Sequence, residues 1–166
     1  TICLRNIDIK KIFELIDKYD VTHFGGAPIV LNMITGAPEA DRKKLKNKVY
    51  VLTAGAPPPS IIFKKMKALG FEVMHVYGLT ETYGHVTQCA WNDEWNDFDE
   101  DKQNEIKARQ GVRYPNTEGV TILDPETMKE VPKDGKTIGE IMIRGNVVMK
   151  GYFKAVSYTH IRAHET

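Results

Sequence analysis

The chain of 166 residues has about the length of one domain, and its net charge of +1 argues against binding nucleic acid through bulk electrostatics. No apolar run is long enough to span a membrane, and no signal peptide is visible, although the chain begins with Thr1 rather than Met. Two isolated cysteines, Cys3 and Cys89, are typical of reduced thiols. These features predict a cytoplasmic protein with a packed core.

The first part of the chain predicts a helix, a strand and a second helix. Residues 7–19 place apolar side chains at helical spacing, with Asn6 or Asp8 as the candidate cap. A short strand at 21–24 ends at a pair of glycines. A proline then favours the first turn of a second helix, from residue 28 through about 34 and closed by Gly36.

The middle of the chain predicts a strand–helix–strand unit, after a short basic helix at 41–47. Residues 49–52 form a continuous apolar run, as expected of a strand covered on both faces. A helix follows, with Ser60 as its cap and Gly70 at its end, and the next strand covers 71–77. Such a connection makes the two strands parallel and neighbouring, so both open on one edge of the sheet.

Polar chemistry concentrates where the second of these strands ends. The strand is expected to break at Gly78, and Thr80, Glu81 and Thr82 follow within four residues. Oxygen ligands after a strand-ending glycine are typical of sites at the carboxyl edge of α/β sheets. In the alternative interpretation this is a capped turn, in which Thr80 or Thr82 only satisfies backbone N–H groups.

The residue pattern changes in the last part of the chain. A helix over 99–110 carries acids early and basic residues late, which suits the helix dipole. From Tyr114 on, short β-rich runs separated by turns predict an antiparallel sheet. We therefore expect an α/β subdomain over 1–113 and a β-rich subdomain over 114–155. Residues 156–166 follow no pattern of the chain and resemble translated sequencing adapter, so we expect a non-native tail there.

Three motifs, in this order, resemble the adenylate-forming (AMP-binding) superfamily. They are Val-Leu-Thr-Ala-Gly-Ala-Pro-Pro-Pro at 51–59, Tyr-Gly-Leu-Thr-Glu-Thr at 77–82, and Gly-Glu-Ile-Met-Ile-Arg-Gly at 139–145 followed by Gly151-Tyr152. The resemblance covers nearly all of residues 1–154. It implies the α/β fold of the superfamily's large domain, a parallel sheet with flanking helices, followed by the start of an antiparallel β-barrel-like subdomain.

The resemblance also implies roles for single residues. Thr80 matches a hydroxyl that contacts phosphate, and Glu81 matches the carboxylate that holds Mg²⁺; its alternative is an exposed turn carboxylate. The nucleotide-binding positions besides Thr80 are Gly55, Ala56, Pro57, His75, Val76, Tyr77 and Gly78. Among them, Tyr77 matches the ring that packs on adenine, and His75 the position that reaches its amino group; the alternatives are a core aromatic and a hydrogen-bonded core histidine. Four residues could line the acyl pocket, namely His23, Gly25, Gly84 and His85.

The implied function is that of an acyl-CoA synthetase, which uses ATP and Mg²⁺ to convert a carboxylic acid to acyl-AMP and transfers the acyl group to coenzyme A. The segment at 21–28 and the insert with Trp91 and Trp95 resemble the short- to medium-chain fatty-acid and aromatic-acid CoA ligases more than peptide-synthetase domains, which implies a fatty or aromatic acid as substrate. We expect the phosphate loop, the ribose-binding Asp and the catalytic Lys of the superfamily to lie outside this chain, which would then be an inactive fragment. The alternatives are an amino-acid-activating adenylation domain and a non-catalytic nucleotide-binding or interaction module.

Overall fold

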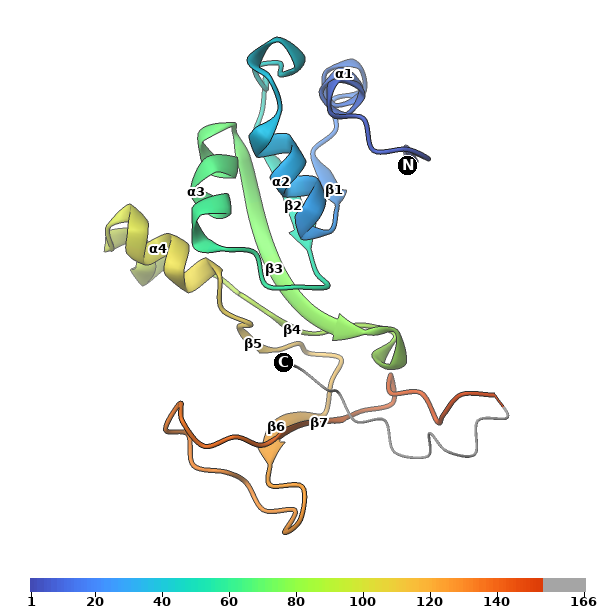
Figure 1. The fold of residues 1–166 in the computed structure, drawn as a ribbon, viewed down its shortest axis with the longest axis vertical. Helices are drawn as coiled ribbons and strands as arrows, with labels where there is room; N and C mark the ends of the chain where they lie inside the picture. The colour runs from blue at the N-terminus through green and yellow to red at the C-terminus, as the bar shows by residue number, and fades with distance from the viewer. Residues whose placement is uncertain (154–166) are drawn as a thin grey trace. The chain divides into compact units, whose positions relative to one another are not determined.

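A computed structural model describes residues 1–153 of the chain, so the expected non-native tail over 156–166 lies outside the described residues (Figure 1). The chain divides into two compact units. The first unit comprises residues 1–77 and 88–112, and the second comprises residues 78–87 together with the chain from Arg113 on. Within residues 1–153, no helix is both long enough and apolar enough to cross a membrane.

The helices of the first unit are α1 (Ile9–Tyr19), α2 (Pro28–Gly36), α3 (Ser60–Ala68) and α4 (Glu100–Lys107), with 3₁₀ turns η1 (Glu39–Asp41) and η3 (Asp93–Asp97). Each α-helix lies where the sequence predicts one. Asp8 caps α1, because its Oδ1 accepts a hydrogen bond of 2.9 Å from the Lys11 N–H. Ser60 is the first helical residue of α3 and makes no side-chain cap, so the predicted cap there is wrong.

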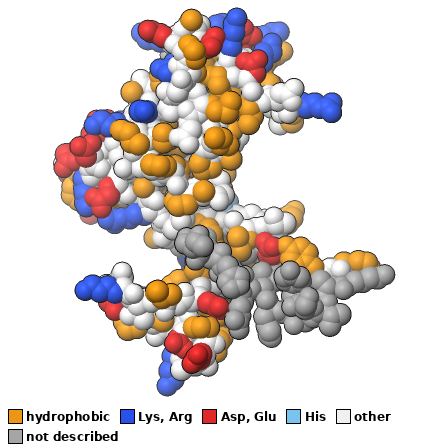
Figure 2. Space-filling view, in the orientation of Figure 1, with side chains coloured by type: hydrophobic (Ala, Val, Ile, Leu, Met, Phe, Trp, Pro, Cys, Tyr) orange, Lys and Arg blue, Asp and Glu red, His pale blue; other side chains and the backbone are white. Residues whose placement is uncertain are grey.

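The basic helix predicted at 41–47 is also wrong, since only the turn η1 forms and residues 42–48 are irregular. Lysines crowded along a short segment repel one another at helical spacing. Here they bind a neighbouring element instead: Lys46 Nζ lies 2.7 Å and Lys43 Nζ 3.5 Å from the Asp17 carboxylate of α1. Figure 2 shows charged side chains gathered near this loop and over α4, with hydrophobic ones between them.

Five strands form one mixed sheet in the order β1-β2-β3-β4-β5. They are β1 (His23–Gly25), β2 (Val49–Thr53), β3 (Phe71–Leu79), β4 (Gly84–Gln88) and β5 (Val112–Arg113). β2 pairs with β1 and with β3 in parallel, and Val51 is the partner of Val73. The predicted strand–helix–strand unit and the α/β fold class are therefore confirmed.

One face of β2 and β3 carries the core of the first unit. Residues of α1, α2 and α3 pack on it, so all three helices cover the same face; the cluster is Phe13, Ile16, Leu31, Ile34, Val49, Val51, Ile62, Phe63, Met66, Phe71 and Val73. On the other face, Tyr50 is 47% and Leu52 42% exposed. Within the described residues, the prediction that β2 is covered on both faces is therefore wrong.

The second unit contains the 3₁₀ turn η2 (Thr80–Thr82) and a two-stranded sheet of β6 (Gly119–Leu123) and β7 (Glu140–Arg144). These strands pair antiparallel, with Ile122 opposite Ile141, as the sequence predicts. The connection between them turns at Asp134, whose carboxylate accepts the N–H groups of Lys136 and Thr137 at 2.8 Å each. These hydrogen bonds lower the pKa of Asp134 to about 2. Residues 1–153 do not form a closed barrel.

Candidate functional site

Within the first unit, the loop after β2 and residues 75–77 of β3 carry predicted nucleotide-binding positions. Gly55, Ala56 and Pro57 lie in an exposed, irregular loop between β2 and α3. Thr53, the last residue of β2, is the register partner of His75. The loop therefore leaves the sheet one strand away from Val76 and Tyr77, at the carboxyl edge that the sequence predicts for a ligand.

His75 is deeply buried, with 2% of its surface exposed. Its Nδ1 lies 3.2 Å from the Arg109 carbonyl oxygen, which can only accept, so Nδ1 carries the hydrogen. Burial lowers the pKa of His75 and favours the neutral ring. Val76 and Tyr77 are also buried. The Nδ1 atom of the imidazole is therefore already engaged in a hydrogen bond within the first unit, and the role of His75 toward adenine stays a prediction.

The strand β3 continues through Gly78 to Leu79, so the predicted break at Gly78 is wrong. The glycine is needed for another reason. A Cβ atom at position 78 would lie 2.1 Å from the Gly84 carbonyl oxygen and 2.5 Å from the His85 Cα. The backbone at Gly84 and His85 therefore passes too close to β3 for any side chain at this point.

The two threonines of the motif have different environments. Thr82 is buried, and its hydroxyl accepts a 2.9 Å hydrogen bond from the Leu79 N–H and lies 2.8 Å from the Gly84 carbonyl oxygen. Thr80 is exposed and makes no side-chain hydrogen bond within residues 1–153. The capped-turn interpretation therefore applies to Thr82, while the Thr80 hydroxyl remains available for a ligand.

Glu81 is partly exposed, and one later segment of the second unit contacts it twice. The Tyr152 hydroxyl donates to Glu81 Oε1, and the Met149 N–H donates to the Glu81 carbonyl oxygen at 2.8 Å. The Tyr152 hydrogen bond lowers the pKa of the Glu81 carboxyl. None of the ion pairs among residues 1–153 involves Glu81. No binding role was expected for Tyr152, and only the Gly151-Tyr152 motif itself could have pointed to this contact.

The donor set around Glu81 fits one kind of magnesium binding. Within the described residues, no group of three or more His, Cys, Asp or Glu could hold a metal ion. Mg²⁺ often binds one or two carboxylates and completes its coordination with substrate phosphates and water. A single ionised carboxylate beside the free Thr80 hydroxyl suits a cation that arrives with a nucleotide, and does not suit a self-contained metal centre.

The four candidates for the acyl pocket divide between the units. In the second unit, the His85 ring contacts Tyr114, with centroids 4.0 Å apart, and Gly84 lies beside it in sequence. In the first unit, His23 stacks on Tyr50 at 5.0 Å. Gly25 pairs with Leu52. The aromatic partners Tyr50 and Tyr114 were not expected from the sequence, because they lie 27 and 29 residues from His23 and His85.

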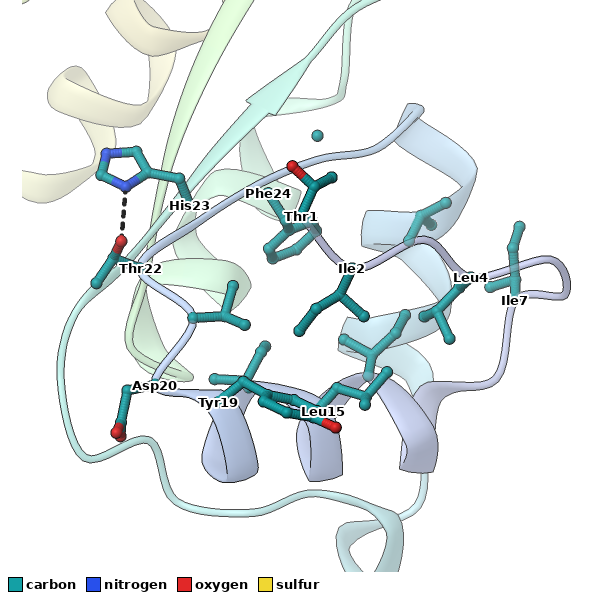
Figure 3. Close-up of a pocket in the computed structure, with 15 residues that line it drawn as sticks. Thr1, Ile2, Leu4, Ile7, Leu15, Tyr19, Asp20, Thr22, His23 and Phe24 are labelled. Carbon is teal, nitrogen blue, oxygen red and sulfur yellow. Dashed lines mark hydrogen bonds between the residues drawn. The ribbon is translucent and has the colours of Figure 1, made fainter.

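A cavity of about 780 Å³ lies in the first unit between the N-terminal segment, α1 and β1. Its lining is mostly apolar, and Figure 3 shows Ile2, Leu4 and Leu15 around it and His23 hydrogen-bonded to Thr22. His23 and Gly25 are among its lining residues. Of the candidate site, the cavity thus includes only these two residues.

A family model described as "AMP-binding enzyme" matches residues 1–153. The chain therefore belongs to the AMP-binding enzyme family. It is 52% identical over 156 residues to the acetate/butyrate–CoA ligase AAE7, peroxisomal, of Arabidopsis thaliana, an alignment that covers 93% of this chain and 27% of that protein. It is 53% identical over 155 residues to the acetate–CoA ligase CCL3 of Humulus lupulus, covering 92% and 27%. The chain thus spans about a quarter of the length of these relatives.

Solved structures agree on the fold. The ATP-bound MatB of Rhodopseudomonas palustris superposes with a TM-score of 0.68 at 25% identity, covering 95% of this chain and 28% of that one. The inhibitor-bound N-terminal domain of FACL13 from Mycobacterium tuberculosis gives a TM-score of 0.70 at 24% identity, covering 91% and 34%. The chain therefore has the fold of part of an N-terminal domain of this kind.

The prediction of a cytoplasmic protein is contradicted by the relatives. The names of AAE7, of the probable acyl-activating enzyme 12 and of a benzoate–CoA ligase, all from Arabidopsis thaliana, each include the word peroxisomal. The prediction relied on reduced cysteines and low net charge, which do not distinguish the cytosol from an organelle whose proteins are addressed by short receptor-read signals.

Proposed function

We propose that the chain is part of the large N-terminal domain of an AMP-forming acid–thiol ligase, which activates a carboxylic acid with ATP and transfers the acyl group to coenzyme A. Membership of the AMP-binding family and the names of the relatives support this reaction. The observation that carries it is the pair Thr80 and Glu81, a free hydroxyl beside an ionised carboxylate directly after β3.

Each part of the site has a role in this proposal. Thr80 donates its hydroxyl to a phosphate oxygen, and Glu81 holds the Mg²⁺ that accompanies ATP; when bound, the cation neutralises charge on the phosphates. The loop at 55–57 lies along the base, where its exposed backbone allows a flat ligand to approach. Tyr77 packs on the adenine from the end of β3, beside Val76 and Gly78.

We infer a small carboxylic acid as the substrate, either a short aliphatic acid or a benzoic acid. The relatives' names specify acetate, butyrate, 2-methylpropanoate and benzoate. The substrate expected from the sequence was a fatty or aromatic acid, and this proposal restricts it to small acids of these two classes.

We also propose how the chain divides into subdomains and in which cellular compartment the full-length protein lies. A unit boundary falls between Val112 and Arg113, which supports an α/β subdomain up to residue 113 and a β-rich subdomain after it. We propose that the chain alone is inactive, because the relatives use roughly four times its length. We place the full-length protein in the peroxisome, which imaging of a tagged copy would test.

The experiment uses the full-length gene product and measures two products, pyrophosphate and acyl-CoA. We expect acid-dependent pyrophosphate release with acetate, butyrate, 2-methylpropanoate or benzoate, followed by thioester formation when coenzyme A is added. Pyrophosphate release with amino acids in place of these acids would identify an amino-acid-activating domain instead. Nucleotide binding without any pyrophosphate release would identify a non-catalytic module.

A further inference from the structure

The segment after β7 returns to the polar turn that follows β3. Tyr152 and Glu81 are 71 residues apart in sequence, and the hydroxyl of the first donates to Oε1 of the second. Three residues before Tyr152, the Met149 N–H donates to the Glu81 carbonyl oxygen at 2.8 Å. One segment therefore fixes both the backbone and the carboxylate of the same residue.

We propose that Tyr152 is a positioning residue for Glu81, whose hydroxyl holds one carboxylate oxygen so that the other is presented to nucleotide-bound Mg²⁺. This inference rests on the proposed function, because it requires that Glu81 binds the cation. Carboxylates that ligate metals are commonly held by a hydrogen bond from a neighbouring group, which fixes their orientation before the metal binds.

The chemistry of tyrosine suits this task. A phenol hydroxyl is neutral at physiological pH, so it orients the carboxylate without cancelling the charge that attracts Mg²⁺. A lysine or arginine at the same place would compete with the cation for Glu81. A rigid ring also loses little conformational entropy when it is fixed, compared with a long flexible side chain.

Two further observations favour positioning over packing. Tyr152 is 48% exposed, so its ring contributes little to a core, whereas a tyrosine kept for packing would be buried. The residue before it, Gly151, has φ of 151°, a conformation that side-chain-bearing residues rarely adopt. The Gly-Tyr pair thus allows a turn that brings the hydroxyl to Glu81.

The test compares Tyr152→Phe with the unmodified full-length protein, because this change removes only the hydroxyl. Binding of a non-hydrolysable ATP analogue is followed by calorimetry over a range of Mg²⁺ concentrations. We expect the half-saturating Mg²⁺ concentration to rise about tenfold, the lower end of the range for removing a group that supports a metal ligand. The melting temperature should not change. Tyr19→Phe deletes an exposed hydroxyl of α1 and should leave both values unchanged.

A second variant, Glu81→Gln, separates the inference from the proposed function. If Tyr152 acts through Glu81, adding Tyr152→Phe to Glu81→Gln should cause no further rise in the half-saturating Mg²⁺ concentration. If Glu81→Gln raises that concentration and Tyr152→Phe alone does not, the positioning role is overturned and the metal role of Glu81 stands. If Glu81→Gln has no effect, the metal role fails and the inference with it. A lower melting temperature for Tyr152→Phe with unchanged Mg²⁺ dependence would show that the hydrogen bond only stabilises the fold, and would overturn the inference.

Discussion

Thr82 accepts a 2.9 Å hydrogen bond from the Leu79 N–H, which ties the turn η2 to the end of β3. The same hydroxyl lies within hydrogen-bond distance of two carbonyl oxygens, those of Leu79 and Gly84. Thr80, two residues earlier, is exposed. Thr82 therefore stabilises the turn, whereas the exposed Thr80 hydroxyl can contact a ligand.

Replacing Thr82 should lower the stability of the folded protein, whereas replacing Thr80 should not. Thr82→Val leaves the partly buried Leu79 N–H without its partner, which should lower the free energy of unfolding by about 1–3 kcal/mol. Thr80→Val should change it by less than about 0.5 kcal/mol, as for most exposed positions, but should slow adenylate formation. Urea unfolding of both variants measures the difference. Equal destabilisation would show that the two hydroxyls are equivalent.

Gly78→Ala should be among the most damaging single changes in the chain. The added methyl group would lie 2.1 Å from a backbone oxygen that cannot move without shifting β4, so we expect a loss of about 3 kcal/mol or more. Gly36→Ala is the matched control, because a Cβ there meets nothing within 4 Å, and it should be neutral or slightly stabilising. A Gly78→Ala protein as stable as Gly36→Ala would refute the close approach of the backbone.

His75 should make the protein less stable in acid. Burial lowers its pKa in the folded state, so the unfolded chain binds the proton more readily. The free energy of unfolding should therefore fall as the pH drops below the unfolded pKa of about 6.5. In His75→Gln this part of the pH dependence between pH 8 and 5 should disappear, as measured by urea unfolding at each pH. An unchanged pH dependence would show that another group is responsible.

The sequence was sufficient for most of the fold because its elements are locally specified. The amphipathic pattern of α1 and the glycine after α3 mark these helices to within two residues. Helical spacing alone failed at residues 42–48, which are irregular and form tertiary ion pairs with Asp17. The predicted strand break at Gly78 was also wrong, because the close approach of the Gly84 and His85 backbone depends on how the chain folds back.

The candidate site was only partly accessible to sequence reasoning. The motif placed Thr80 and Glu81 directly after a buried strand, but two threonines of the same chemistry could not be told apart without the hydrogen bonds of Thr82. The contact between Glu81 and Tyr152 joins residues far apart in the chain, and no periodicity predicts such a pair.

The most direct test of the central claim is the effect of Glu81→Gln on the two half-reactions of the full-length enzyme. The change keeps size and hydrogen bonding but removes the charge. Acid-dependent pyrophosphate release should fall about 10²- to 10³-fold, as for the loss of other single electrostatic groups, with the melting temperature unchanged. Thioester formation from synthetic acyl-adenylate should be nearly unaffected, because pyrophosphate has already left. Pyrophosphate release at the unmodified rate would contradict the account and leave Glu81 as a turn residue.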